Sequence, residues 1–190
     1  MRALLLFLGI SLALGSVAAS AQQGQLPAGM TMHRIQAGTL DANGWAPASS
    51  TGGGFSLKIP CTFNDFTMDQ SAANSIVLKS HTVGCLRQDQ RKFSATRFQY
   101  RNGAKAAKEY FDRNASGEGW GKDAELKKLT FKGKPAVDVT VKNAERCGVL
   151  RYVLLQADMI MMAVEAPVAT CEGLKAQVVE FFGSLNVEAQ

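Results

Sequence analysis

The sequence predicts an α+β domain in which antiparallel strands joined by hairpins pack with two helices. Short runs that alternate apolar and polar residues, such as "FSLKI" at residues 55–59, are typical of half-buried strands. Two longer stretches, at residues 102–115 and 170–185, repeat apolar residues every three or four positions, which favours helices. Short polar connections, such as "KGK" at residues 132–134, indicate hairpins.

The first segment has the pattern of a secretory signal peptide over residues 1–21. Arg2 is followed by the apolar run "ALLLFLGISLALG", and Ala19 and Ala21 occupy the small-residue positions of a cleavage site before Gln22. A membrane anchor is the alternative, but the run is shorter than the roughly 20 apolar residues that a spanning helix needs. We therefore expect an exported protein, periplasmic or secreted, with no transmembrane segment after cleavage.

The segment at residues 22–44 is poor in charge and rich in Gly, Ala, Ser and Pro, which predicts a flexible or partly ordered N-terminal arm. Within it, "MTMHRIQAG" at residues 30–38 could form a short strand. The remainder, residues 45–190, is expected to be a single domain. Its first strand starts at Phe55, and three glycines at residues 52–54 allow the chain to bend from the arm into the sheet.

Six further strands are expected along the domain. They fall in three successive pairs, of which the last includes a continuously apolar run that predicts a central strand buried on both faces. The runs are "SIVLKSHTV" and "RKFSATRFQY", then "LKKLTF" and "PAVDVTV", then "LRYVLLQ" and "MIMMAVEA".

The two expected helices each have a candidate N-cap. Asn102 precedes the first, whose apolar stripe is Ala104, Ala107 and Phe111. Thr170 precedes the second. The stripe of that helix consists of Leu174, Val178, Phe181 and Leu185.

The chain contains four cysteines, an even number that indicates two disulfide bonds in an oxidising compartment. Three pairings are possible, and the sequential one is favoured: Cys61–Cys85 and Cys147–Cys171. The second pair has the better support, because the hairpin turn at residues 157–158 brings Cys147 near the start of the last helix. If the first two strands form a hairpin, Cys61 and Cys85 fall at its opposite ends.

The positive charge is unevenly distributed. Residues 86–134 contain thirteen Lys and Arg against six Asp and Glu, whereas the whole chain has a formal net charge of +5. This region could bind an anionic partner from the cell envelope, or it could be a solvated surface of mixed charge. Nucleic acid is not an expected partner. The candidate residues are Arg87, Arg91, Lys92, Arg97, Arg101, Lys105 and Lys108.

Motifs for catalysis, cofactors and metals are not found. The triple glycine precedes a strand, whereas a phosphate-binding loop follows a strand and opens a helix. The two histidines, His33 and His81, are far apart and lack metal-ligand spacing. We therefore expect no catalytic, cofactor-binding or metal-binding residues.

The order of elements resembles the PsbP-like superfamily, which includes the photosystem extrinsic PsbP proteins, the Ran-binding Mog family and mycobacterial LpqN-type lipoproteins. The resemblance covers about residues 45–187 and rests mainly on "GGFSLKIP", "RYVLLQADMIMMAVEAP" and "VVEFFGSL". It implies a twisted antiparallel sheet of about six strands with helices on both faces. It also implies binding of protein partners and brings no catalytic residues. The four cysteines and the lack of a lipid-attachment cysteine depart from these relatives.

These observations predict a non-catalytic exported protein that binds a partner or assists assembly. Two alternatives remain open. One is a small envelope hydrolase that uses His81 with a nearby serine, and the other is a small-ligand carrier with a pocket near Trp45.

Overall fold

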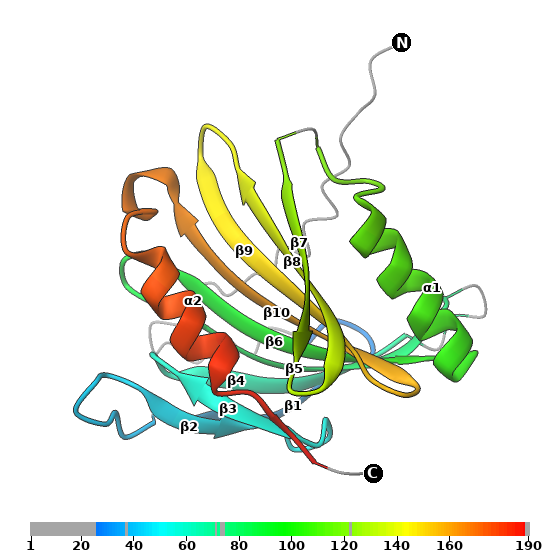
Figure 1. The fold of residues 1–190 in the computed structure, drawn as a ribbon. Helices are drawn as coiled ribbons and strands as arrows, with labels where there is room; N and C mark the ends of the chain where they lie inside the picture. Colours follow the sequence, from blue (N-terminus) through cyan, green and yellow to red (C-terminus); the bar gives the residue numbers. More distant parts are fainter. Residues whose placement is uncertain (1–25, 37, 71, 73–74, 122, 189–190) are drawn as a thin grey trace.

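The computed structural model describes residues 26–36, 38–70, 72, 75–121 and 123–188 (Figure 1). The predicted signal peptide at residues 1–21 lies outside the described residues. In the part of the chain that is described, no helix has the length and apolar character needed to cross a membrane.

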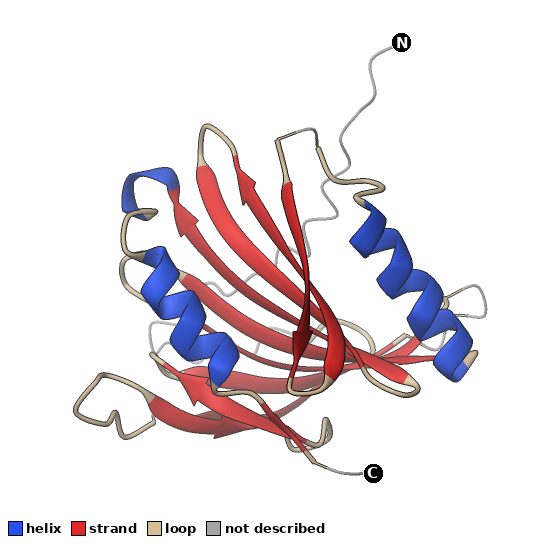
Figure 2. Ribbon diagram, in the orientation of Figure 1, coloured by secondary structure: helices blue, strands red, loops and turns tan. Residues whose placement is uncertain are grey.

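A large antiparallel sheet forms the centre of the molecule (Figure 2). Within the described residues it has eight strands, in the order β1-β4-β5-β6-β10-β9-β8-β7. The strands are β1 (Met30–Gln36), β4 (Phe63–Asp69), β5 (Val77–Leu86), β6 (Lys92–Tyr100), β7 (Glu125–Phe131), β8 (Lys134–Lys142), β9 (Arg146–Leu154) and β10 (Asp158–Pro167). The apolar strand β10 lies between β6 and β9, as expected of a central strand.

A smaller three-stranded sheet, in the order β11-β3-β2, lies beside the large one (Figure 1). Its strands are β2 (Ala46–Ser49), β3 (Phe55–Ile59) and β11 (Asn186–Val187). The helical elements are α1 (Gly103–Ser116), the short 3-10 helix η1 (Val168–Thr170) and α2 (Leu174–Gly183).

Alternation along the central strands divides the core into two clusters. Ile160 and Met162 of β10 belong to the larger cluster, which contains the inward side chains of α2 and of the small sheet. Met159, one residue away, belongs to the second cluster together with Phe111 of α1. We call the two sides of the large sheet the Ile160 face and the Met159 face. A period of two residues explains why β10 is apolar throughout.

The expected architecture is corrected in size and layering. The large sheet has eight strands in the described part of the chain, where about six were predicted. Helices alone do not cover both faces as predicted, since on the Ile160 face the small sheet provides much of the cover together with α2. Figure 1 shows α2 close to β2 and β3, with α1 well separated from them.

Strand β4 is one of the strands that were not predicted, and it explains the first disulfide bond. Because β4 pairs antiparallel with β5, with Asn64 opposite Gly84, the residues just before β4 lie beside the end of β5. Cys61 is thereby bonded to Cys85, with a Cα–Cα distance of 5.9 Å. Cys147 is bonded to Cys171 at a Cα–Cα distance of 6.0 Å, and the pairing is the sequential one.

The possible strand at residues 30–38 is present as β1, which pairs with β4 along the edge of the large sheet. Two local predictions are corrected. Thr170 does not cap α2: it ends η1, and Gly173, with a φ of 80°, precedes the helix. Ala104 is exposed, and the buried side of α1 contains Ala106 in its place.

Candidate functional site

A row of polar side chains crosses the Ile160 face of the large sheet. Thr67 on β4 is paired with His81 on β5, and His81 is paired with Arg97 on β6. These positions share the face of Phe63, Val83 and Ala95, because each is an even number of residues from one of these apolar residues on its own strand. Asp158, at the start of β10, is on the same face as Ile160. We call the set His33, Thr67, His81, Arg97 and Asp158 the polar row.

One half of the polar row is a hydrogen-bonded chain of two imidazoles and one hydroxyl. The Thr67 Oγ1 lies 2.9 Å from the Nδ1 of His81 and 2.7 Å from the Nε2 of His33. Thr67 and His81 are buried, whereas His33, on the edge strand β1, is exposed. A hydroxyl has one hydrogen and two lone pairs, so Thr67 can accept from one imidazole while donating to the other. The chain therefore connects a buried histidine to the surface.

The environment of His81 favours its neutral form. Burial lowers the pKa of the imidazole, and the positive charges of Lys79, His33 and Arg97 lower it further, against an opposing hydrogen bond with Gln99. A charged imidazole would lose its hydration on this face without gaining a carboxylate partner.

The other half of the polar row is a buried ion pair. The Nε and Nη2 of Arg97 both lie 2.8 Å from the Oδ2 of Asp158, and Arg97 is 3% exposed. The Nη1 of Arg97 also donates to the carbonyl oxygen of Gly53, at 2.9 Å. A guanidinium carries five N–H groups, and these two hydrogen bonds and the ion-pair contact of Nη2 involve three of them.

The triple glycine covers the polar row. The absence of side chains lets its backbone contact His81 and Arg97. It belongs to the loop between β2 and β3. A Cβ on Gly52 would lie 2.7 Å from the Nδ1 of His81, and one on Gly54, where φ is +58°, would lie 3.3 Å from the Nη1 of Arg97. The glycines therefore belong to a hairpin loop that lies against the polar row. The sequence predicted a bend between the arm and the sheet, and this prediction is corrected.

Asp65 fixes this loop from the sheet below. Its carboxylate is fully buried and accepts hydrogen bonds from the backbone N–H and the hydroxyl of Thr51, at 2.8 Å and 2.5 Å. The hydroxyl of Ser50 in turn accepts from the backbone N–H of Gly53, at 3.1 Å. The loop is held in place over Arg97 by these bonds.

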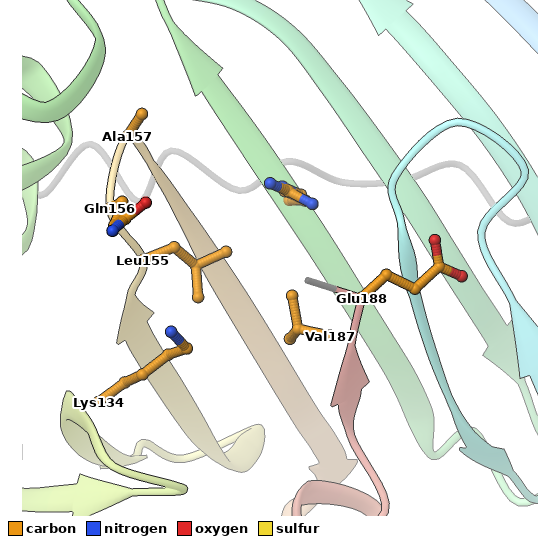
Figure 3. A pocket seen from close by; sticks show the side chains of 7 residues that line it. Lys134, Leu155, Gln156, Ala157, Val187 and Glu188 are labelled. Atoms are coloured by element: carbon orange, nitrogen blue, oxygen red, sulfur yellow. The ribbon is translucent and has the colours of Figure 1, made fainter. Parts of the chain in front are cut away.

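A pocket of about 340 Å³ opens beside Arg97 (Figure 3). This volume is within the range of sites for small ligands. The lining combines two cationic side chains, one carboxylate, one amide and three aliphatic side chains. Its residues are Arg97, Lys134, Leu155, Gln156, Ala157, Val187 and Glu188.

The first alternative was a hydrolase that uses His81 with a nearby serine. In the structure a threonine takes the place of that serine beside His81. The hydroxyl that His81 contacts is that of Thr67. Ser80, the nearest serine in sequence, lies one residue before His81 on β5, so its side chain points to the Met159 face. Groups of three or more metal-ligating side chains are absent from the described residues.

The second alternative was a small-ligand carrier with a pocket near Trp45, but the pocket in the structure lies beside Arg97. Trp45 is 8% exposed, and its ring contacts that of Phe93 edge-on at a centroid distance of 5.9 Å. It is therefore a core residue, and the lining of the pocket at Arg97 does not include it.

The predicted anionic-partner residues do not form one surface. Arg97 was predicted to lie on an anion-binding surface, and this prediction is corrected because Arg97 is buried in an ion pair with Asp158. Arg87, Arg91 and Lys92 lie at the start of β6, whereas Arg101, Lys105 and Lys108 follow its end, about 27 Å away for a nine-residue strand. Several are engaged locally: Arg91 donates to the carbonyl oxygen of Thr170, Arg101 to that of Ser75, and Lys105 and Lys108 face Glu109 and Asp112.

Sequence reasoning missed most of the residues at the pocket. Lys134 and Ala157 lie in the predicted hairpin turns and Glu188 lies close to the chain end, and the pocket forms where a hairpin turn and β11 meet. One available signal was Arg97, a charged residue on the same face of its strand as Phe93 and Ala95. Such a residue requires a buried partner.

Compared with protein-family models and with curated protein sequences, the chain matches none. Among solved structures it is similar to the solution structure of cyanobacterial PsbP (CyanoP) from Synechocystis sp. PCC 6803. The TM-score is 0.46 and the sequence identity 13%, over 80% of this chain and 97% of that chain. Similarity of this degree establishes neither a common fold nor a common function, and membership of the PsbP-like superfamily stays a prediction.

Proposed function

We propose that the protein is an exported, non-catalytic binding module whose ligand or partner segment enters the pocket beside Arg97. The observation that carries this proposal is a pocket of ligand size with a buried, oriented guanidinium at its wall. Two of the five N–H groups of Arg97 are not involved in its described hydrogen bonds and ion pair, so the side chain can bind an oxygen without first being reoriented.

Export is supported by two independent features. The N-terminal residues have the pattern of a signal peptide, and all four cysteines are disulfide-bonded. Disulfide bonds persist in oxidising compartments such as the periplasm and the extracellular medium.

The pocket is formed by residues whose positions are fixed before a ligand binds. Its walls come from a hairpin turn, from the start of β8 and from β11, and the Gly53 carbonyl and Asp158 fix Arg97 behind them. Arrangements of this kind lower the cost of ordering on binding.

Chemical-shift mapping on ¹⁵N-labelled protein tests the proposal. A panel of short peptides, carboxylates, phosphates and sugars is added, and the amides of Leu155, Gln156 and Val187 are expected to move for at least one class. The variant Ala157→Trp fills the pocket mouth and should abolish the response. Ala144→Trp, at an exposed position in the turn between β8 and β9, is the matched control and should preserve it. Shifts confined to other surfaces, or a response that survives in the Ala157→Trp variant, would reject the pocket as the binding site.

A further inference from the structure

Strand β11 presents an unpaired backbone edge at the pocket. The backbone N–H of Glu188 donates to the carbonyl oxygen of Gly54, at 3.0 Å, so Glu188 faces β3. Residues of an antiparallel strand alternate in the direction of their N–H and C=O groups, so Val187 faces away from β3. The pairing of Val187 opposite Phe55 agrees, because the Phe55 carbonyl accepts from Ser50 on the other side.

This edge is open in the described part of the chain. The small sheet has the order β11-β3-β2, so β11 has one strand neighbour there. Val187 is also a lining residue of the pocket. A segment of extended backbone in the pocket could therefore add to the sheet by donating to and accepting from Val187.

The charges around the pocket favour a ligand with separated charges. Lys134 and Glu188 lie on opposite sides, with Leu155 and Val187 between them (Figure 3). The charge of Arg97 is balanced by Asp158, which leaves one cation and one anion at the pocket walls. A phosphate dianion would meet the Glu188 carboxylate, and a hydrocarbon chain would leave Lys134, Gln156 and Glu188 without partners. A short peptide has an extended polar backbone, apolar side chains and a carboxylate at one end.

We propose that the pocket binds a short extended peptide that pairs with Val187 and whose free C-terminal carboxylate meets Lys134. This inference rests on the proposed function, because it assigns a ligand class to the same pocket. Since β11 has two residues, the paired part of the ligand is about two or three residues long. The peptide is either a free oligopeptide or the C-terminal end of a partner protein, which share this chemistry.

The test uses three synthetic probes: Ala-Val-Ala, its C-terminal amide, and the same acid with an N-methyl group on the valine. Titration into ¹⁵N-labelled protein should move the amides of Val187 and Gln156 with the acid. Binding of the amide should be at least tenfold weaker, because the amide lacks the negative charge that strengthens a hydrogen bond from the Lys134 ammonium. Binding of the N-methylated acid should be weaker as well, because it cannot donate to the Val187 carbonyl.

Two variants locate the carboxylate. Lys134→Gln should remove the preference for the acid over the amide. Lys128→Gln, at an exposed position on neighbouring β7, should leave that preference unchanged. If acid and amide bind the native protein equally, or if the N-methylated acid binds as well as the parent, the peptide assignment is wrong.

The outcome also separates this inference from the proposed function. A response of the pocket amides to other ligand classes but not to the acid would overturn the peptide and keep the binding module. No response to any class would overturn both. A carrier protein ending in Ala-Val-Ala distinguishes the two sources: binding equal to that of the tripeptide indicates a partner's chain end, and binding of the free tripeptide alone indicates an oligopeptide.

Discussion

Arg97 holds a single oxygen of Asp158, the Oδ2, with two of its nitrogens at 2.8 Å each, in a position where both residues are buried. This pair joins β6 to the start of β10 and lies between the glycine loop and the pocket. It determines both the stability of this end of the sheet and the direction in which the guanidinium points.

Substitution of Asp158 by Asn should leave the Arg97 charge buried without its partner. We expect a loss of about 3–5 kcal/mol in the free energy of unfolding, measured by urea titration. Lys105→Gln, which removes one member of an exposed pair on α1, should change that free energy by less than about 0.5 kcal/mol. A loss below about 1 kcal/mol for the Asp158→Asn variant would mean that the pair is not buried as described.

The pKa of His81 predicts a pH dependence of stability. Burial lowers the pKa of the folded protein's imidazole, so the unfolded chain binds the proton more readily. The unfolding free energy should therefore be unaffected by His81 above about pH 6.5 and should fall as the pH drops from there to the folded-state pKa.

The variant His81→Gln tests the assignment, because Gln keeps a polar partner for Thr67 but does not titrate in this range. Denaturant unfolding between pH 5 and 8 should show a smaller fall in stability for the variant than for the native protein. Identical slopes in the two proteins would assign the pH dependence to other groups.

Gly52→Ala tests the contact between the glycine loop and the polar row. The added Cβ would lie 2.7 Å from the Nδ1 of His81, so the loop or the histidine must move. We expect a cost of about 1–3 kcal/mol, which lowers the melting temperature by several degrees in a domain of this size. Gly121→Ala is the control, since a Cβ there has nothing within 4 Å. Equal melting temperatures for the two variants would contradict the described loop position.

The two disulfide bonds should contribute similar amounts to stability. Each connects cysteines 24 positions apart, for which loop-closure entropy gives about 3.5 kcal/mol. The double variants Cys61→Ala/Cys85→Ala and Cys147→Ala/Cys171→Ala should each lower the free energy of unfolding by about 2–4 kcal/mol. A reductant should change the unfolding midpoint of the native protein, and an unchanged midpoint would argue against bonded cysteines.

Much of the fold could be predicted from periodicity, whereas the site could not. The runs that became β3, β6, β8, β9 and β10 follow simple alternation or a continuous apolar pattern. Strand β4 was missed because "FNDFTMD" contains two acidic residues, of which Asp65 is buried and satisfied by the glycine loop. Strand β11 was missed because it has two residues, which are too few to show an alternating pattern.

The pocket depends on segments that meet only in three dimensions. Lys134 begins β8, Gln156 lies in the turn between β9 and β10, and Glu188 comes after β11. Sequence spacing does not relate these positions, since their proximity follows from the strand order and from the small sheet packing on the large one. The three glycines predicted a bend from the arm into the sheet, whereas they lie in the loop between β2 and β3 and contact His81 and Arg97.

A crystal structure of the protein with saturating Ala-Val-Ala shows directly whether the pocket beside Arg97 binds an extended peptide. We expect an extended tripeptide between Val187 and the turn at residues 155–157, hydrogen-bonded to the Val187 backbone and with its carboxylate at Lys134. A tripeptide bound on another surface, with the pocket beside Arg97 empty, would contradict this assignment.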